Sequence, residues 1–358
     1  MTGVRVCGRR HAVADENNAG DLQERYQGRS KKIHGGSGGY EVGSDGLGTT
    51  KRSAWLILYK LHAGTCGFDS VLRFSFFLEQ TPILDTPLIE IENVSVFREQ
   101  THILRGVSVR IPRKRHTAVL GPNGSGKSSL LKLLTRDFYP SVEAQGHQGT
   151  VLILGESDWE VSRLRRRMGI VTPALDYEFS SGRTGRMTVT EAVASGFTAT
   201  RLKEFGPSVD QAMADAIAGA IETVKMSDLS RRTLSTLSTG ERRRVMIARA
   251  IVHDPDIFVL DEPTNGLDMT ARALFLEILD SITKQDAMTM VLVTHHIDEI
   301  PPAMNHVILL DQGRVTFDGP KADGLTAPRI SSLFRANVHV DARADGWYRS
   351  EMQGLPKG

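Results

Sequence analysis

A glycine-rich stretch at residues 121–129 constrains this chain more than any other part of its sequence. It fits the pattern G-x-x-x-x-G-K-[ST], with a short apolar run before it at 117–120 and a leucine-rich segment after it at 130–134. A buried strand before and a helix after are the context in which this pattern binds phosphate. The residues concerned are Gly121, Pro122, Asn123, Gly124, Ser125, Gly126, Lys127, Ser128 and Ser129.

Each residue type in this loop suits an anion. Gly121, Gly124 and Gly126 can adopt backbone angles closed to other residues, so that consecutive N–H groups point inward. A helix beginning at Lys127 adds the positive end of its dipole, and the lysine is expected to reach the outer phosphates of a nucleotide. Ser128 is a predicted ligand of Mg²⁺, which keeps several waters and takes few protein oxygens.

A carboxylate pair follows a second buried strand. Residues 257–260 are apolar, and Asp261 and Glu262 come directly after them. Ligands of open α/β sheets bind beyond the carboxyl ends of the parallel strands. We therefore predict that Asp261 holds Mg²⁺ through water and that Glu262 orients and polarises the attacking water in phosphoryl transfer. An Asp-Glu pair without such a strand is typical of a solvated loop.

The remaining apolar segments predict an α/β fold. Residues 88–96 and 106–111 alternate like half-buried strands, while 288–294 and 306–310 are apolar runs separated by helical segments. This predicts a mainly parallel sheet, an N-terminal antiparallel β portion and a helical subdomain at about 185–245. Capping-box pairs are predicted at Thr188 with Glu191 and at Ser208 with Gln211.

Composition divides the chain and excludes some functions. Eleven of the first fifty residues are glycine, so 1–84 is expected to be disordered or an over-extended gene start, with a small docking helix at 53–80 as the alternative. The domain that carries the phosphate-binding loop is expected at 85–335 and a short tail at 336–358. A net charge of +2 argues against nucleic-acid binding, and two cysteines fit a reducing cytoplasm. The arginine runs at 163–167 and 242–244 are expected to be solvated faces.

The segment 237–241 resembles the L-S-G-G-Q signature of ATP-binding cassette proteins. It consists of Leu237, Ser238, Thr239, Gly240 and Glu241, with threonine and glutamate in place of glycine and glutamine. Over residues 88–335 the chain resembles the nucleotide-binding domain of that family. The resemblance implies a P-loop NTPase that hydrolyses Mg-ATP in a homodimer, where the signature contacts the ATP held by the other protomer. Ser238 and Glu241 are also spaced as a capping box.

Three further positions match family motifs. Asp268 matches the D-loop aspartate, which crosses the dimer interface, and His295 matches the switch histidine, with His296 as a bystander. Phe97 matches the aromatic residue that stacks on adenine, although an aromatic residue on this strand could equally belong to the core. The predicted catalytic set is therefore Glu262, His295 and Lys127.

One expected residue is missing. The family usually has glutamine after the strand at 168–171, and this chain has Pro173. Proline offers no side-chain donor or acceptor, which puts the usual coupling to a permease in doubt. This region looks most like the molybdate-transport/photorepair-type ATPase group.

Two functions remain open at this point. The first is the ATPase subunit of an ABC transporter with separate permease chains. It would be cytoplasmic or peripheral on the cytoplasmic face of the inner membrane. The alternative is a soluble ATPase acting on a macromolecule, such as a repair or translation factor.

Overall fold

The structure is a computed structural model that describes the backbone of residues 33–35 and 38–40 and the whole of residues 87–143, 146–198, 210–285 and 288–354. The chain divides into two compact units, residues 1–79 and 80–358. In the first unit, β1 (Ile33–Gly35) and β2 (Gly38–Tyr40) form an antiparallel hairpin within the glycine-rich stretch. The rest of the segment predicted as 1–84, including the possible docking helix, lies outside the described residues.

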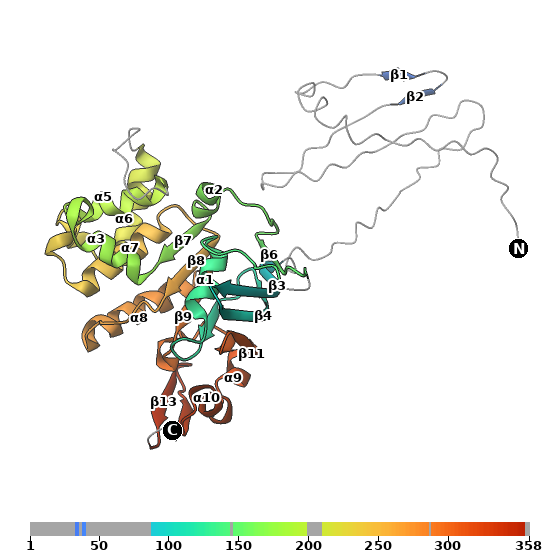
Figure 1. Ribbon diagram of the computed structural model, residues 1–358. Coiled ribbons are helices and arrows are strands. Elements are labelled where there is room, and N and C mark those ends of the chain that lie inside the picture. Colours follow the sequence, from blue (N-terminus) through green and yellow to red (C-terminus); the bar gives the residue numbers. More distant parts are fainter. Residues whose placement is uncertain are drawn as a thin grey trace, which may run out of the picture. The chain divides into compact units, whose positions relative to one another are not determined.

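The second unit is built on a mainly parallel sheet with the strand order β11-β10-β5-β9-β8-β7 (Figure 1). Every neighbouring pair is parallel except β10 with β11, which confirms the predicted fold class. Strands β5 and β9 are buried at every residue because both faces of the sheet are covered. The strand bounds are β5 (Thr117–Leu120), β7 (Met168–Val171), β8 (Ile257–Asp261), β9 (Thr289–Thr294), β10 (His306–Asp311) and β11 (Arg314–Pro320).

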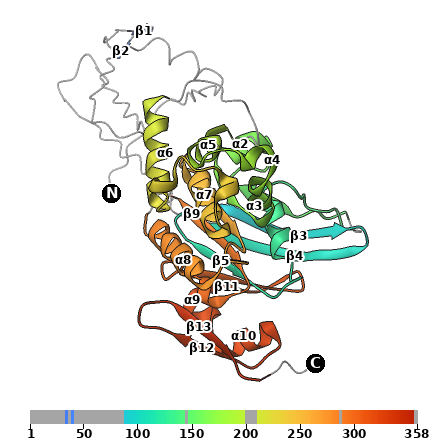
Figure 2. The same ribbon diagram turned by 90° about the vertical axis from the view of Figure 1, so that its left-hand side faces the viewer.

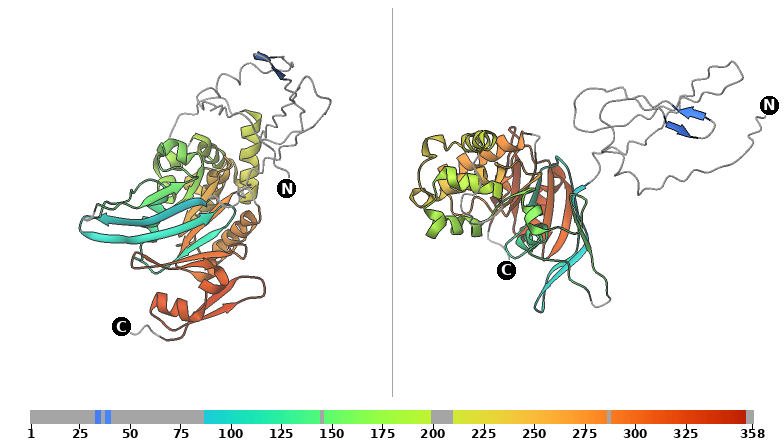
Figure 3. Two further views of the ribbon diagram at one scale, coloured as in Figure 1. Left: turned by 90° about the vertical axis from the view of Figure 1, so that its right-hand side faces the viewer. Right: turned by 90° about the horizontal axis from the view of Figure 1, so that it is seen from above.

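The two faces of this sheet pack into different cores. Along β5, Val119 belongs to the core shared with helix α1 (Lys127–Leu134) and the antiparallel strands, whereas its neighbours Ala118 and Leu120 belong to the core shared with the helices. The antiparallel sheet has the order β4-β3-β6, with β3 (Pro87–Arg98), β4 (Thr101–Pro112) and β6 (Thr150–Ile153). Figure 3 shows β3 and β4 on one side of the parallel sheet and the helical subdomain on the other.

The helical subdomain begins earlier than predicted, directly after β7. Pro173 is the first residue of α3, and the side chain of Thr172 caps this helix by accepting a hydrogen bond from the Leu175 backbone N–H (3.3 Å). Proline suits this position because its missing N–H would have no helical partner there. The helices of this region are α3 (Pro173–Ser180), α4 (Gly182–Gly185), α5 (Val189–Ala194), α6 (Gln211–Thr223) and α7 (Thr239–Ile251), with short 3₁₀ turns at Ser195–Thr198, Ser227–Leu229 and Leu234–Thr236. The short helix α2 (Val161–Arg165) precedes β7.

The predicted helix caps have different outcomes. The capping box of Thr188 with Glu191 is confirmed. The cap predicted at Ser208 is wrong, because α6 is capped by Asp210, whose carboxylate accepts a hydrogen bond from Met213 N (2.8 Å). A carboxylate caps a helix start well and also interacts favourably with the helix dipole; Ser208 itself lies outside the described residues.

The C-terminal part packs below the sheet (Figure 2). It contains α9 (Lys321–Gly324), α10 (Ala327–Phe334) and the hairpin β12 (Val338–Ala342) with β13 (Tyr348–Met352). Helix α8 (Met269–Thr283) lies between β8 and β9 in the chain, and a 3₁₀ turn at Ile297–Glu299 follows β9. The buried Lys321 Nζ donates hydrogen bonds to the carbonyls of Pro301, Pro302 and Gly346. Most of the segment expected as a tail from 336 therefore forms an ordered hairpin fixed by Lys321.

Among the described residues, no helix combines the length and the apolar character that crossing a bilayer requires.

Candidate active site

Strand register gathers the predicted site at one edge of the parallel sheet. Leu120, the last residue of β5, pairs with Thr294 at the end of β9, and Asp261 at the end of β8 pairs with Val293. The residues that follow these strand ends are Gly121, His295 and Glu262. Parallel strands therefore bring together three segments that are far apart in sequence.

The phosphate loop is held tightly against its neighbours. A Cβ on Gly121 would overlap the carbonyl oxygen of Leu310, so this glycine is required by space rather than by its backbone angles as predicted. Gly126 has φ 107°, which favours glycine, and it immediately precedes α1. Lys127 is 4% exposed, and its Nζ donates hydrogen bonds to the carbonyls of Gly121 (2.9 Å) and Pro122 (3.1 Å).

Glu262 lies among three partners. Its Oε1 is 3.4 Å from Lys127 Nζ and 3.2 Å from His295 Nδ1, and its Oε2 accepts a hydrogen bond from Asn265 Nδ2 (2.6 Å). Burial alone would raise the pKa of Glu262, but the Lys127 ammonium and the interaction with His295 outweigh it and lower this pKa. The carboxyl is therefore ionised near neutral pH and can accept a hydrogen bond from a water.

Asp261 fits the role of a metal ligand. Its Oδ1 is buried and has no hydrogen-bond partner among the described residues, whereas the nearby Ser128 hydroxyl acts to lower the pKa of the same carboxyl group. Burial, and then the nearby Glu262, raise the pKa of Asp261 to about 6. A divalent cation would remove this penalty. The described residues hold no cluster of three or more metal-binding side chains, and Mg²⁺ needs only one or two protein carboxylates beside substrate phosphates.

The signature segment forms the start of α7. Ser238 caps the helix, and the capping box with Glu241 is confirmed, with Ser238 N donating to Glu241 Oε2 (2.8 Å). This hydrogen bond is the main cause that lowers the pKa of Glu241. A Cβ on Gly240 would lie 2.8 Å from Ala271 Cβ of α8, so glycine permits this close packing. Thr239 stands where the family signature has a glycine, and its Oγ1 accepts a hydrogen bond from Arg242 (3.4 Å).

The other two predicted site residues are Phe97 on the β3–β4 hairpin and Asp268 at the start of α8. Phe97 is 42% exposed and stacks on His102 with ring centroids 4.1 Å apart. Its hairpin reaches the phosphate loop, since a Cβ on Gly126 would lie 2.9 Å from the Leu104 side chain. Asp268 caps α8 by accepting a hydrogen bond from Ala271 N (2.8 Å).

Two contributors were not singled out from the sequence. Asn265 precedes the predicted D-loop aspartate by three residues and was given no role of its own, but its Nδ2 donates a hydrogen bond to Glu262. The run at 242–244 was expected to be solvated, and this is wrong, because Arg243 is 7% exposed. A run of arginines gives no sequence signal for which member is turned inward.

The arrangement can support phosphoryl transfer. Lys127 and the N-terminus of α1 can bind outer phosphates. Mg²⁺, held by Ser128 and Asp261, would neutralise charge on phosphate oxygens. Glu262, ionised and oriented by Asn265 and His295, can accept a hydrogen bond from the attacking water. Such positioning is most of what a protein contributes to this reaction.

Comparisons with known proteins agree with this geometry. The family model described as "ABC transporter" matches residues 104–265. The chain is 32% identical over 259 residues to the uncharacterized ABC transporter ATP-binding protein YlmA of Bacillus subtilis (strain 168), which corresponds to 71% of this chain and 93% of YlmA. It is 34% identical over 237 residues to the zinc uptake system ATP-binding protein ZurA of Listeria innocua, covering 65% of this chain and 85% of ZurA.

Solved structures give the same result. The structure of CbiO1 from Clostridium perfringens, described as part of the ABC transporter complex CbiONQ, has a TM-score of 0.55 and 26% identity, and the match covers 69% of this chain and 98% of CbiO1. None of these relatives favours the soluble repair or translation factor, and the molybdate-transport/photorepair subgroup stays a prediction. The chain belongs to the ABC transporter family, and it is an ATP-binding, ATP-hydrolysing subunit of such a transporter.

Proposed function

We propose that two copies of this chain form a homodimer that encloses two ATP molecules, each between the phosphate loop of one copy and the signature segment of the other. One observation carries the proposal. Ser238 is exposed, and within the described residues the hydrogen bonds of Leu237, Ser238 and Thr239 go to Leu234 and to the start of α7, and none reaches the phosphate loop. A phosphate-binding N-terminus of α7 is therefore free for a second molecule.

The neighbouring surface supports this interface. Gly240 packs on Ala271, which places the signature beside the start of α8. Met269 at that start is 88% exposed, directly after Asp268. An exposed methionine next to an exposed helix N-terminus suits contact with another protomer. In this dimer Glu262, His295 and Lys127 act on the ATP of their own chain, with Mg²⁺ held by Ser128 and Asp261.

Phe97 is proposed to stack on the adenine ring. Its exposed ring lies on the hairpin that contacts the phosphate loop at Gly126. Replacing Phe97 with alanine should weaken ATP binding by about 1–2 kcal/mol, the usual worth of such stacking, whereas inorganic triphosphate should bind equally well. Calorimetric titration of both ligands into wild type and variant measures this. Equal losses for ATP and triphosphate would assign Phe97 to packing of the hairpin.

We further propose that the dimer works with separate permease subunits at the cytoplasmic face of the membrane. The relatives support this, since CbiO1 is described as part of a transporter complex. The test is to isolate the full chain from detergent-solubilised membranes of its own cells. A multi-span membrane protein should copurify in constant ratio, and its removal should release the chain from membranes. Recovery only from the soluble fraction, bound to ribosomes or DNA, would overturn the transporter assignment.

A further inference from the structure

The turn that carries Glu262 is held in an uncommon backbone conformation. Glu262 has φ 44°, in a region that few non-glycine residues occupy and that neighbouring contacts must maintain. On one side, Glu262 N donates a hydrogen bond to the carbonyl of Val293 (2.8 Å). On the other, the carbonyl of Pro263 accepts a hydrogen bond from Arg243 Nη1 of α7. Arg243 therefore touches the backbone one residue beyond the proposed catalytic carboxylate.

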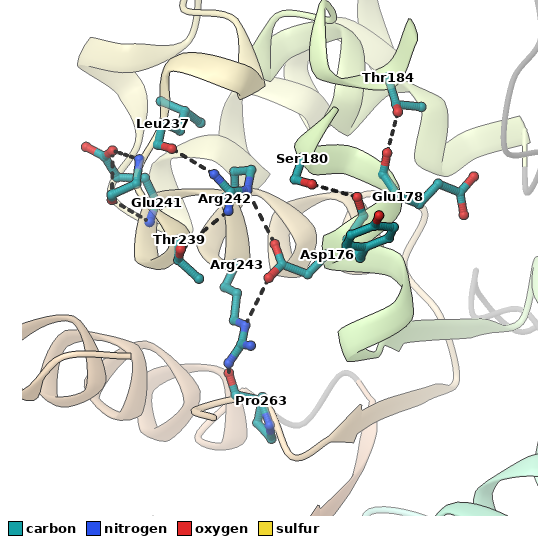
Figure 4. Close-up of polar contacts among 12 residues, drawn as sticks. Asp176, Glu178, Ser180, Thr184, Leu237, Thr239, Glu241, Arg242, Arg243 and Pro263 are labelled. Atoms are coloured by element: carbon teal, nitrogen blue, oxygen red, sulfur yellow. Dashed lines mark hydrogen bonds and ion pairs between the residues drawn. The ribbon is translucent and has the colours of Figure 1, made fainter. Parts of the chain in front are cut away.

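Arg243 is in turn held by Asp176 of α3. Asp176 Oδ2 lies 3.5 Å from Arg243 Nε, and both side chains are largely buried, with 13% and 8% exposed. Figure 4 shows Arg243 extending from α7 to Pro263 with Asp176 beside its guanidinium. Burial lowers the pKa of Arg243 and the Asp176 carboxylate opposes this effect, so the acid favours the charged form that donates to Pro263.

The same carboxylate also reaches the signature segment. Asp176 Oδ1 lies 3.5 Å from Arg242 Nε, and Arg242 Nη1 donates a hydrogen bond to the Leu237 carbonyl (2.8 Å). Asp176 therefore joins two arginines of α7, of which one holds the signature and the other holds the turn after Glu262 (Figure 4). The next arginine differs, because among the described residues Arg244 donates hydrogen bonds to the carbonyls of Val224 and Lys225 rather than to the turn after Glu262.

We propose that Asp176 and Arg243 are positioning residues for ATP hydrolysis. Asp176 fixes the Arg243 guanidinium against the Pro263 carbonyl, and this contact sets the orientation of Glu262 relative to the nucleotide. Asp176 lies on α3 and contacts both Arg243 and Arg242, the arginine that holds the signature segment. A shift of α3 or of the signature segment would therefore change the placement of Glu262. The inference rests on the assignment of Glu262 as the residue that orients the attacking water.

The test compares kcat and KM for ATP in full-length variants. Asp176→Asn keeps the shape of the side chain but removes its negative charge. Arg243→Gln shortens the side chain so that it no longer reaches the Pro263 carbonyl. Each should lower kcat on the order of 10-fold, because small misplacement of a catalytic group is costly, while KM changes less than about 2-fold. The kcat of the double variant should fall no further than that of Arg243→Gln alone, because the effects of two residues in direct contact do not add. Arg244→Gln, on the same helix, is the matched control and should keep the wild-type kcat.

A second measurement separates positioning from general loss of structure. Combined with Glu262→Gln, the Asp176→Asn variant should still dimerise with ATP, and its melting temperature should stay close to that of Arg244→Gln. Wild-type kcat in Asp176→Asn, or equal losses in it and in Arg244→Gln, would overturn the proposal. If Glu262→Gln itself keeps full turnover, the assignment of Glu262 fails instead, so the two failures are distinguishable.

Discussion

The Glu262→Gln variant is expected to bind ATP normally and to hydrolyse it on the order of 10²–10⁴-fold more slowly, the usual contribution of a positioned acid–base group. Glutamine has nearly the same shape but cannot accept a proton or present an ionised oxygen to the attacking water. It also removes the negative charge that faces Lys127 (3.4 Å) and His295 (3.2 Å). Binding of an anionic nucleotide should therefore be retained or strengthened while the chemical step is lost.

This variant should also show the dimer directly. Without hydrolysis, the two nucleotides stay bound and the dimer does not reopen. Light scattering after gel filtration should give a monomer mass without nucleotide and a dimer mass with ATP. The control is Glu277→Gln, a glutamate 66% exposed and paired with Lys225, which should turn over ATP at the wild-type rate. A Glu262→Gln protein that remains monomeric with saturating ATP would contradict the shared-site proposal.

The Lys127→Ala variant is expected to lose nucleotide binding itself. The ammonium is 4% exposed and lies between the loop carbonyls and the Glu262 carboxylate. Truncating one member of a buried, hydrogen-bonded charge pair costs about 2–5 kcal/mol, so ATP affinity should fall by about 30-fold or more. Glu262 would also lose the positive charge that most lowers its pKa, which leaves a carboxylate unpaired close to the phosphates.

Isothermal titration of ATP and an ATPase assay at saturating nucleotide measure the two effects separately. Lys132→Ala is the matched control, because Lys132 lies on the same helix but is exposed and contacts the Phe138 ring. It should bind ATP like the wild type. If Lys127→Ala kept wild-type affinity for ATP, the glycine loop would not be the phosphate-binding site. The proposal that two protomers share each ATP would then be contradicted.

Local chemistry allowed much of the site to be predicted. The glycine loop lies between a strand and a helix, and the two carboxylates follow a buried strand. In both cases the residues that identify the site are adjacent in the sequence. Ser238 and Glu241 are three apart and cap their own helix, so this pair could also be identified from the sequence. The sequence did not show that Pro173 begins a helix, since the helical pattern of α3 is short and its start follows the strand after a single residue.

Sequence alone determined the parallel sheet, the phosphate loop and the order of the motifs, because each depends on neighbours along the chain. Tertiary structure decided which distant side chains meet. Asn265 orients Glu262, and Asp176 joins the arginines of α7 to the Pro263 carbonyl only because β7 and β8 are adjacent parallel strands whose ends release α3 and the catalytic turn at one edge. A run of three arginines does not indicate which one is buried. Helix α7 packs against α3 and α8, and in this packing Arg243 is turned inward to the Pro263 carbonyl. Which arginine is buried therefore depends on contacts between helices that are far apart in the sequence.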